Sequence, residues 1–345
     1  MPERLGVVLV GTGFATQYLH LPRLVQIPQA HPVAIVSRNM ERAKVLARQF
    51  GVEACYTDLD EALKRDDVHL VDINVPTYLH KENVVRAAAA GKHVLCEKPM
   101  AQTLAEADEM IEAAKRAGTK LMIAHVLRFV PEYLKVKELA DAGCLGNVVA
   151  ARAVRIPGPG YPWEGMPKES RALPHWKAEA AKGGGILDLQ IHDIDYLRFL
   201  FNTQVETVCA VGGRLAEKTV DALDHAFANI KLRDGRVWHV TSSWVRPIEC
   251  PFIQNLELYG SEGYLVLDNL NSPPLTLYSN DGTVSRIEPR GTDGIHAEIQ
   301  HFVNCILHNK APSISPEDSR GSLEVSLAVA KSIETMKPVT LPLAE

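Results

Sequence analysis

The feature that most constrains the fold is an apolar segment that runs directly into a glycine turn, LGVVLVGTGFAT at residues 5–16. Leu5–Val10 has the length and composition of a buried strand. The residues from Phe14 to about Ile27 are predicted to form a helix that Pro22 kinks. A glycine turn between a strand and a helix is the context of the dinucleotide-binding fingerprint. The alternative is a glycine turn that binds no ligand.

The residues of this turn have distinct places in that interpretation. Gly11 permits the tight turn, and Gly13 lets the backbone approach a pyrophosphate at the helix N-terminus. Thr16 stands where the fingerprint prefers glycine or alanine. Its larger side chain is expected to loosen the contact between helix and strand. The residues expected to contact the cofactor here are Gly11, Thr12, Gly13, Phe14 and Ala15.

The end of the second predicted strand, Val33–Val36, bears on the choice of cofactor. Enzymes that use NAD usually carry an acidic residue there, which accepts hydrogen bonds from the ribose hydroxyls. This chain has Ser37-Arg38-Asn39 instead. Ser37 can donate to a 2′-phosphate, and Arg38 can pair with one or stack on adenine. NADP(H) is therefore the favoured cofactor and NAD(H) the second candidate. The alternative interpretation of Arg38 is an exposed arginine that only ends a strand.

The pattern of predicted elements changes about one third of the way along the chain. Up to that point strands and helices alternate with short loops, which predicts a parallel, doubly wound sheet over residues 1–124. From residue 147 strands dominate, and the turns RDGR, GSEG and NDG at 233–236, 260–263 and 280–282 predict antiparallel hairpins. We therefore expect an α/β protein with a dinucleotide-binding domain at 1–124 and an α+β domain at 125–345. The second domain is expected to carry one open, mainly antiparallel sheet, whose free face a second subunit commonly covers.

Composition argues against several classes of protein. The formal net charge of −5 gives no reason to expect nucleic acid as a partner. No apolar run approaches the roughly 20 residues that span a bilayer, so no membrane association is expected. The first residues, MPERLGVVLV, lack the pattern of a signal peptide. The six cysteines, at 55, 96, 144, 209, 250 and 305, include no CxxC pair and are interpreted as reduced thiols of a cytoplasmic protein.

A first pair of ionisable residues lies in the stretch HVLCEKPMA at residues 93–101. Glu97 and Lys98 follow the end of a predicted strand, and ligands of doubly wound sheets bind beyond the carboxyl ends of the strands. Beside a nicotinamide ring, the Lys98 ammonium could hydrogen-bond a substrate oxygen and follow the charge that develops on it. The alternative is a surface ion pair between Glu97 and Lys98, which would contribute little.

A second group lies in GGGILDLQIHDIDYLRFLF at residues 183–201. The glycines allow the backbone to pass close to a ligand, and a helix is predicted to start near Ile186. Asp188 and His192 are four residues apart and therefore project from one face of that helix. Asp188 could orient the imidazole of His192, which is suited to removing a hydroxyl proton while a hydride leaves the same carbon. The alternatives are a histidine that only satisfies a core hydrogen bond, and a metal site, against which the absence of HExxH argues.

Together these motifs resemble the Gfo/Idh/MocA oxidoreductases, the family of glucose–fructose oxidoreductase and inositol dehydrogenase. The resemblance runs from GTGFAT through VPTYLHKENVVRAAAAGKHVLCEKPMA at 75–101 and GGGILDLQIHDIDYL at 183–197 to SPEDSRGSLEVSLAVAKS at 315–332. It implies an N-terminal Rossmann domain and a C-terminal α/β domain whose open sheet forms homodimer or homotetramer contacts. It also implies a cis bond between Lys98 and Pro99.

The resemblance implies roles for individual residues as well. Lys98, Asp188 and His192 take the places of the catalytic residues, and Glu97 and Lys98 would lie near the nicotinamide ribose. The loop after the fourth strand would face the cofactor through Val75, Pro76, Thr77, Leu79 and His80. His125 and Arg128 would face the cleft, with a tether between the domains as the alternative. Where family members often carry Trp-Arg, this chain has Trp176-Lys177.

The predicted function is hydride transfer between a nicotinamide cofactor and a sugar, polyol or related carbohydrate-like alcohol or ketone. His192 would take the hydroxyl proton while Lys98 steadies the oxygen. The loop at 157–176 offers Tyr161, Trp163 and Trp176 for stacking on a sugar ring, beside Lys177. Two alternatives remain: a regulatory protein that binds the dinucleotide without turning it over, and a glycosidase that uses a tightly held NAD. The sequence sets neither the substrate nor the direction.

Overall fold

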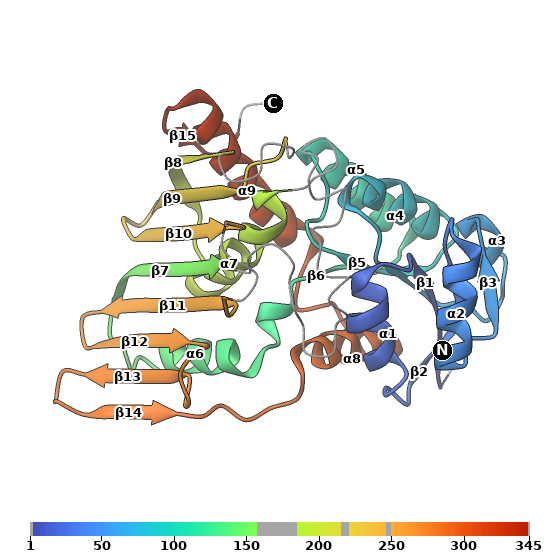
Figure 1. The fold of residues 1–345 in the computed structure, drawn as a ribbon, viewed down its shortest axis with the longest axis horizontal. Coiled ribbons are helices and arrows are strands. Elements are labelled where there is room, and N and C mark those ends of the chain that lie inside the picture. Colours follow the sequence, from blue (N-terminus) through green and yellow to red (C-terminus); the bar gives the residue numbers. More distant parts are fainter. Residues whose placement is uncertain (1–2, 157–184, 215–220, 246–249, 344–345) are drawn as a thin grey trace. The chain divides into compact units, whose positions relative to one another are not determined.

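A computed structural model describes residues 3–156, 185–214, 221–245 and 250–343 (Figure 1). The chain forms two compact units, Met1–Phe129 with Thr292–Gly321 and Val130–Gly291 with Ser322–Glu345. This differs from the expected division after residue 124, because the chain returns to the first unit near its C-terminal end.

The first unit contains a sheet of six parallel strands in the order β3-β2-β1-β4-β5-β6. The strands are β1 (Leu5–Val10), β2 (Ala30–Val36), β3 (Ala54–Tyr56), β4 (Leu70–Ile73), β5 (His93–Glu97) and β6 (Leu121–Ala124). The strand order reverses between β1 and β4, and doubly wound sheets bind their ligands beyond the strand ends at such a point. The predicted doubly wound sheet is therefore confirmed.

Helices cover both faces of this sheet, with α4 and α5 on one side and α1 and α8 on the other (Figure 1). The helical segments are α2 (Met40–Phe50), α3 (Leu59–Leu63), η2 (Thr77–Leu79), α4 (His80–Ala89), α5 (Leu104–Ala117), η3 (Val126–Arg128) and α8 (Gly294–Leu307). Asn39 caps α2 by accepting from the Arg42 N–H, and Thr103 caps α5 by accepting from the Glu106 N–H. Glu106 in return accepts from the Gln102 N–H, one residue before the cap.

The helix after β1 has two windings, a π-helical segment η1 (Ala15–His20) and a short α-helix α1 (Leu21–Leu24). It ends earlier than the predicted Ile27. Pro22 cannot supply the N–H that a regular helix would direct to the Tyr18 carbonyl. That carbonyl instead accepts a hydrogen bond from the Arg23 guanidinium. The predicted irregularity at Pro22 is thus a change of winding that begins before the proline.

Helix α8 explains why the C-terminal part contributes to the first unit. Its apolar side chains join one buried cluster with strands β1, β4 and β5 and with helices α1 and α2. The α8 residues of this cluster are Ile295, Ile299, Phe302, Val303, Cys305 and Ile306. Burial of a phenylalanine or isoleucine side chain contributes about 1.5–3 kcal/mol, so the return of the chain is a substantial part of this core.

The second unit is built on a nine-stranded sheet in the order β14-β13-β12-β11-β7-β10-β9-β8-β15. The strands are β7 (Val148–Ile156), β8 (Val205–Gly213), β9 (His225–Leu232), β10 (Val237–Ser243), β11 (Ile253–Gly260), β12 (Gly263–Asp268), β13 (Leu275–Ser279), β14 (Val284–Ile287) and β15 (Val339–Thr340). Strands β7 and β10 pair in parallel, and the other pairs are antiparallel. The three predicted hairpin turns join β9 to β10, β11 to β12 and β13 to β14, as expected.

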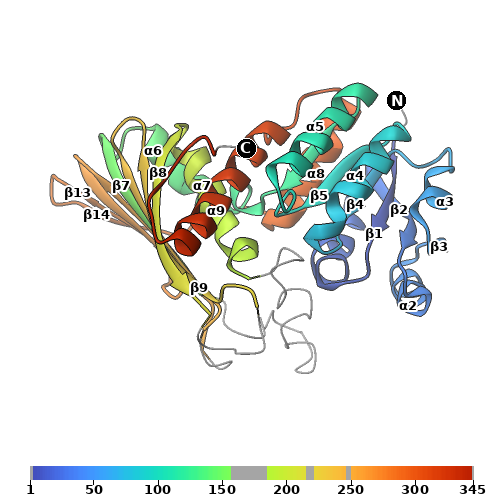
Figure 2. The ribbon, with the colours of Figure 1, turned by 90° about the horizontal axis from the view of Figure 1, so that it is seen from above.

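Among the residues that the structure describes, helices pack on one face of this sheet only (Figure 2). They are α6 (Pro131–Asp141), α7 (Ile186–Phe201) and the part of α9 (Pro316–Thr335) that belongs to the second unit. Side chains on the covered face, such as Leu256 and Leu258, are fully buried. Alternate residues on the other face, such as Tyr259, are exposed. The predicted open, mainly antiparallel sheet is confirmed. None of the helices in the described ranges is long and apolar enough to cross a membrane.

Candidate active site

Gly11 lies where the ends of three strands meet. Its N–H donates to the Val36 carbonyl at 2.8 Å, and its φ of +110° lies in the region that favours glycine. A Cβ at this position would lie 2.4 Å from the backbone oxygen of Asn74, which follows β4. Glycine at position 11 is therefore required by the path of the backbone itself.

Gly13 differs, because no atom of the described residues lies within 4 Å of the place where its Cβ would be. Packing within the chain therefore gives no reason for glycine here. The following helix presents N–H groups that lack partners within the helix, as every helix start does. An open approach to such a start fits the pyrophosphate of a dinucleotide. The residues at this turn thus fit the cofactor that the fingerprint predicts.

Thr16, the departure from the fingerprint, is fully buried in η1. Its hydroxyl donates to the Gly11 carbonyl at 3.0 Å. The hydroxyl of Thr16 thus supplies a hydrogen bond to the turn, and a looser contact between helix and strand stays a prediction.

The residues at the end of β2 form a small polar group. The hydroxyls of Thr12 and Ser37 share a hydrogen bond of 2.9 Å, and the Ser37 oxygen also accepts from the Asn39 N–H at 3.2 Å. Arg38 is exposed. Because Asn39 is occupied as the α2 cap, Ser37 and Arg38 are the side chains here that remain candidates for contact with a ribose substituent.

The loop after β4 is fixed from behind by His80. Its Nε2 lies 2.8 Å from the Val75 carbonyl, and its Nδ1 lies 2.9 Å from the Pro99 carbonyl. The side chain is buried, and burial lowers the pKa of His80. This histidine links the β4 loop to the loop after β5. Thr77 is buried, whereas Val75, Pro76 and Leu79 are partly exposed, and direct contact of these residues with a cofactor stays a prediction.

Lys98 follows the last residue of β5 and is partly buried. Its backbone N–H donates to Oε2 of Glu97 at 3.0 Å. The other carboxylate oxygen of Glu97, Oε1, lies 3.2 Å from Nε2 of His20. The Lys98–Pro99 bond is cis, as the resemblance implied. The Glu97 carboxylate is therefore held by a backbone N–H and by a histidine. These contacts go beyond the simple surface ion pair with Lys98 that was the alternative interpretation.

His125 and Arg128 lie just past β6, both buried. The Arg128 guanidinium binds the carboxylate of Asp318 at 2.5 Å, in the first turn of α9. This pair ties η3 to the start of α9 within the first unit. In the structure the Arg128 side chain thus acts as a tether. Contact with substrate stays a prediction for both His125 and Arg128.

Asp188 and His192 lie one turn apart on α7, which begins after Gly185. Asp188 is buried and His192 is partly exposed. Gly185 has φ +77°, and a Cβ there would lie 2.7 Å from Leu223 O. This glycine was expected to make room for a ligand. The structure gives it another reason, the close approach of residues 222–223.

Two buried polar contacts hold α7 in the second unit. Arg155 of β7 binds Asp193 through two hydrogen bonds of 2.7 and 2.9 Å. The Ser322 hydroxyl donates to Asp195 at 2.9 Å. Asp193 and Asp195 are both buried. They anchor the helix and so fix the direction in which Asp188 and His192 project.

The candidate residues therefore divide between the two units. The turn at 11–15, Ser37, Arg38, the β4 loop and Lys98 belong to the first unit, and Asp188 and His192 belong to the second. Their convergence on one substrate stays a prediction. Tyr161, Trp163, Trp176 and Lys177 lie outside the described residues.

Sequence reasoning missed His20 and Asp72. His20 Nδ1 lies 3.0 Å from the Asp72 carboxylate, and both side chains are buried. A signal was present, because Asp72 is a charged residue inside the otherwise apolar strand LVDI, and a buried carboxylate requires a partner.

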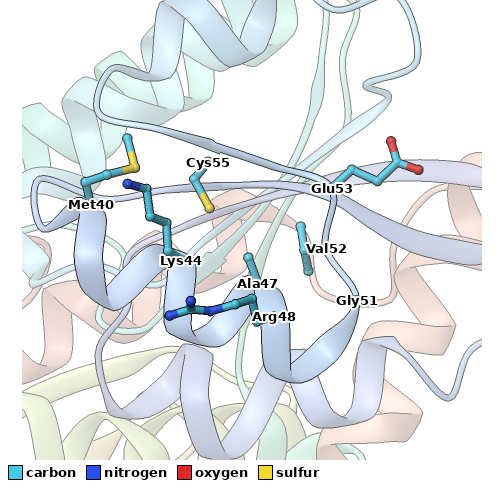
Figure 3. A pocket seen from close by; sticks show the side chains of 8 residues that line it. All are labelled: Met40, Lys44, Ala47, Arg48, Gly51, Val52, Glu53 and Cys55. Carbon is cyan, nitrogen blue, oxygen red and sulfur yellow. The ribbon is translucent and has the colours of Figure 1, made fainter.

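A separate hollow on the surface of α2 and β3, lined by residues that include Lys44, Arg48 and Cys55 (Figure 3), contains none of the candidate residues.

Comparisons with known proteins agree with this geometry. Residues 5–125 match the family described as "Oxidoreductase family, NAD-binding Rossmann fold", and residues 133–266 match the "GFO/IDH/MocA C-terminal domain". Myo-inositol 2-dehydrogenase of Thermotoga maritima is 28% identical, over 98% of each chain. The 2,7-anhydro-N-acetylneuraminate hydratase of Mediterraneibacter gnavus is 30% identical, over 77% of this chain and 68% of the relative.

A solved structure supports the same assignment. The aldose-aldose oxidoreductase from Caulobacter crescentus, complexed with glycerol, superposes with a TM-score of 0.85 at 25% identity, over 98% of this chain and all of that one. Both domain matches and the full-length likeness therefore point to one group of enzymes. The chain belongs to the Gfo/Idh/MocA family of oxidoreductases that bind NAD(P) through a Rossmann domain.

Proposed function

We propose that the protein interconverts a secondary alcohol and a ketone on a sugar, polyol or related carbohydrate-like substrate. The observation that carries the proposal is Lys98, a partly buried amine placed directly at the carboxyl end of β5, two strands from β1 and its cofactor turn. The names of the relatives, an inositol dehydrogenase and an aldose-aldose oxidoreductase, support the substrate class.

The chain's own residues supply binding and proton transfer. In the oxidative direction His192 removes the hydroxyl proton, and Asp188 one turn earlier orients its ring and favours the imidazolium that forms. The Lys98 ammonium donates a hydrogen bond to the same oxygen and stabilises the negative charge that develops there. The bound nicotinamide supplies the hydride acceptor or donor. Reduction follows the same residues in reverse.

The test is a panel of polyols, aldoses and keto-sugars assayed with both cofactors, on the wild type and on Lys98→Met and His192→Asn. Loss of the proton acceptor should lower the rate by at least about 10²-fold. Lys64→Met and His308→Asn change an exposed lysine and an exposed histidine and serve as matched controls. Wild-type rates in both site variants would reject the proposed roles.

We propose further that NADP(H) is preferred over NAD(H). The support is the absence of an acidic residue at positions 37–39, the exposed Arg38, and the hydroxyl pair of Thr12 and Ser37. Because a hydrogen bond to a charged group contributes about 1.5–3 kcal/mol, Arg38→Ala should weaken NADPH binding by roughly 10- to 100-fold and leave NADH binding nearly unchanged. Arg48→Ala, another exposed arginine on the adjoining helix, is the control. Tighter binding of NADH than NADPH by the wild type would reverse this proposal.

The alternative of a glycosidase that uses a tightly held NAD to oxidise and re-reduce its sugar is less well supported, because the named relatives include an inositol dehydrogenase and an aldose-aldose oxidoreductase. Net turnover of added free cofactor with a simple polyol would exclude it as the main activity. A regulatory role without turnover is the remaining alternative, and it requires that Lys98→Ala keep every cellular function.

We also propose that the protein assembles as a homodimer or homotetramer through the open face of the second unit's sheet. Exposed apolar side chains gather on that face, because the strand register aligns them. They include Phe227, Val237, Tyr259 and Tyr278. Light scattering on the wild type and on Phe227→Lys tests this, and a monomeric wild type would contradict it.

Six free thiols support a cytoplasmic location, which fractionation of cells would check.

A further inference from the structure

A network of three ionisable side chains, two buried and one partly exposed, reaches the backbone of Lys98. His20 Nδ1 lies 3.0 Å from both carboxylate oxygens of Asp72, and His20 Nε2 lies 3.2 Å from Oε1 of Glu97. His20 and Asp72 are each 1% exposed, so water does not compete for their contact, whereas the Glu97 side chain is 17% exposed. Oε2 of Glu97 accepts from the Lys98 N–H at 3.0 Å. The contacts therefore run without a break from the interior of β4 to the end of β5.

The strand register explains why these side chains meet. Asp72 is paired with Leu9 of β1 and with Leu95 of β5, so these three residues share one face of the sheet. Glu97 lies two residues beyond Leu95 and therefore projects to the same face. This is the face on which η1 packs, and its buried residues are Thr16 and His20. The π-helical winding of η1, a feature often found at functional sites, thus brings the imidazole over two carboxylates.

The geometry fixes the charge of the imidazole. Carboxylates only accept hydrogen bonds, so each ring nitrogen of His20 forms a favourable contact only when it carries a proton. In a neutral ring one of the two nitrogens carries a lone pair instead of a proton, and that lone pair would face a carboxylate. Burial alone would lower the pKa of His20, but Asp72 and Glu97 together raise it well above its ordinary value. With both carboxylates ionised, we expect His20 to be an imidazolium that also reduces the repulsion between them.

Two other ionisable side chains, Cys96 and His80, lie close enough to interact with Glu97. Burial raises the pKa of the Cys96 thiol well above its ordinary value, and burial lowers the pKa of His80. The Cys96 thiol is therefore neutral near pH 7. The described residues also contain no group of three His, Cys, Asp or Glu side chains placed to hold a metal ion, so the contacts of His20 are hydrogen bonds.

We propose that His20 is a positioning residue for the reaction: clamped between Asp72 and Glu97, it fixes the Glu97 carboxylate and through it the backbone from which the Lys98 amine reaches the substrate. The inference rests on the proposed function only in taking Lys98 as the group that contacts substrate. A histidine with a purely structural role would be exchangeable for any well-packed polar side chain. A positioning cation is not, because a displacement of about 1 Å at a reacting group costs roughly 10²-fold in rate.

The charge state is tested first, by ¹⁵N NMR of the histidine rings in the wild-type protein. Of the 13 histidines, we expect one whose two ring nitrogens both stay protonated at pH 8, and which disappears from the spectrum of His20→Gln. The same signal should persist in Lys98→Met. A His20 ring that is neutral at pH 7 in the wild type would overturn the inference without any activity measurement.

The positioning role is tested by steady-state kinetics and cofactor titration of His20→Gln. We expect kcat to fall by about 10- to 100-fold, while the Kd for NADPH changes by less than about 3-fold. The matched control is His93→Gln at the other end of β5, where the ring accepts from the Lys120 N–H at 2.9 Å. A glutamine carbonyl can replace that acceptor, so its kcat should equal that of the wild type.

The outcomes separate this inference from the proposed function. Unchanged kcat in a folded His20→Gln, with activity lost in Lys98→Met, rejects the role of His20 alone. Full activity of Lys98→Met rejects the proposed function, whatever the NMR signal of His20. If His20→Gln does not fold, Asp72→Asn removes one carboxylate with little change in shape. It should lower both kcat and the pH at which the His20 ring loses its proton, and a variant in which neither changes would also reject the inference.

Discussion

The two glycines of the cofactor turn should respond to alanine in opposite ways. In Gly11→Ala the left-handed backbone costs about 1–2 kcal/mol, and the overlap of the new Cβ with the Asn74 oxygen adds about 1–3 kcal/mol, so the free energy of unfolding should fall by roughly 2–5 kcal/mol. In Gly13→Ala the new methyl group meets no atom of the described part of the chain within 4 Å. The free protein should then be unchanged or stabilised by up to about 1 kcal/mol, because alanine restricts the unfolded chain.

Cofactor binding, unlike stability, should be sensitive to the change at Gly13. The Gly13 methyl group would occupy the space through which a pyrophosphate approaches the helix start, so Gly13→Ala should weaken NADPH binding by at least about 10-fold, or 1.4 kcal/mol. The assay is a thermal scan without cofactor, in which Gly11→Ala should lower the midpoint by roughly 5 °C or more. A fluorescence titration with NADPH on both variants completes it.

One result would refute this reasoning. If Gly13→Ala binds NADPH as tightly as the wild type while remaining fully folded, the turn does not hold a pyrophosphate. A Gly11→Ala variant as stable as the wild type would show that the turn can relax around a side chain, contrary to the distances given above.

Three further predictions concern the stability of the protein and the contacts that hold α7 in place. Arg155→Met leaves the Asp193 carboxylate buried without its cation and should lower the free energy of unfolding by about 3–5 kcal/mol, measured by urea titration. Gly185→Ala should strain the start of α7 and lower kcat without changing NADPH affinity, measured by kinetics and titration. The pKa of His93 is lowered by burial and by the Lys120 charge. The contribution of neutral His93 to the free energy of unfolding should therefore be complete above pH 6.5. It should be lost as the pH falls below 6.5, because the unfolded state binds the proton first.

Each of these has an outcome that contradicts it. An Arg155→Met variant as stable as the wild type would show that Asp193 finds another partner or is protonated at little cost. Normal kcat in Gly185→Ala would separate the start of α7 from the reaction. For His93, stability measured between pH 5 and 8 should depend less on pH in His93→Gln, and an equal slope in both proteins would refute the argument.

Much of the fold could be predicted because it depends on local patterns. The caps at Asn39 and Thr103, the turn at Gly11 and the glycine-containing hairpins are each specified by a few adjacent residues. Such local signals place strands and helices in order. The alternation of those elements then limits the topology to a doubly wound sheet followed by an antiparallel one.

What could not be predicted depends on contacts between distant residues. Arg128 meets Asp318 across 190 positions, and Arg155 meets Asp193 across 38. No local pattern shows that α8 fills the core of the first unit. The His20 network is intermediate: Asp72 stands out in its strand, but its partner could be identified only once the register between β1, β4 and β5 was known.

The most direct test of the central claim is transfer of deuterium from C4 of the reduced nicotinamide to the carbonyl carbon of a keto-sugar or keto-polyol, followed by mass spectrometry. The account predicts label in the product of the wild type and of the Lys64→Met and His308→Asn controls. It predicts a rate at least about 10²-fold lower in His192→Asn and a large loss in Lys98→Met. Label transferred at the wild-type rate by both site variants would contradict the claim that these two residues act on one reacting carbon.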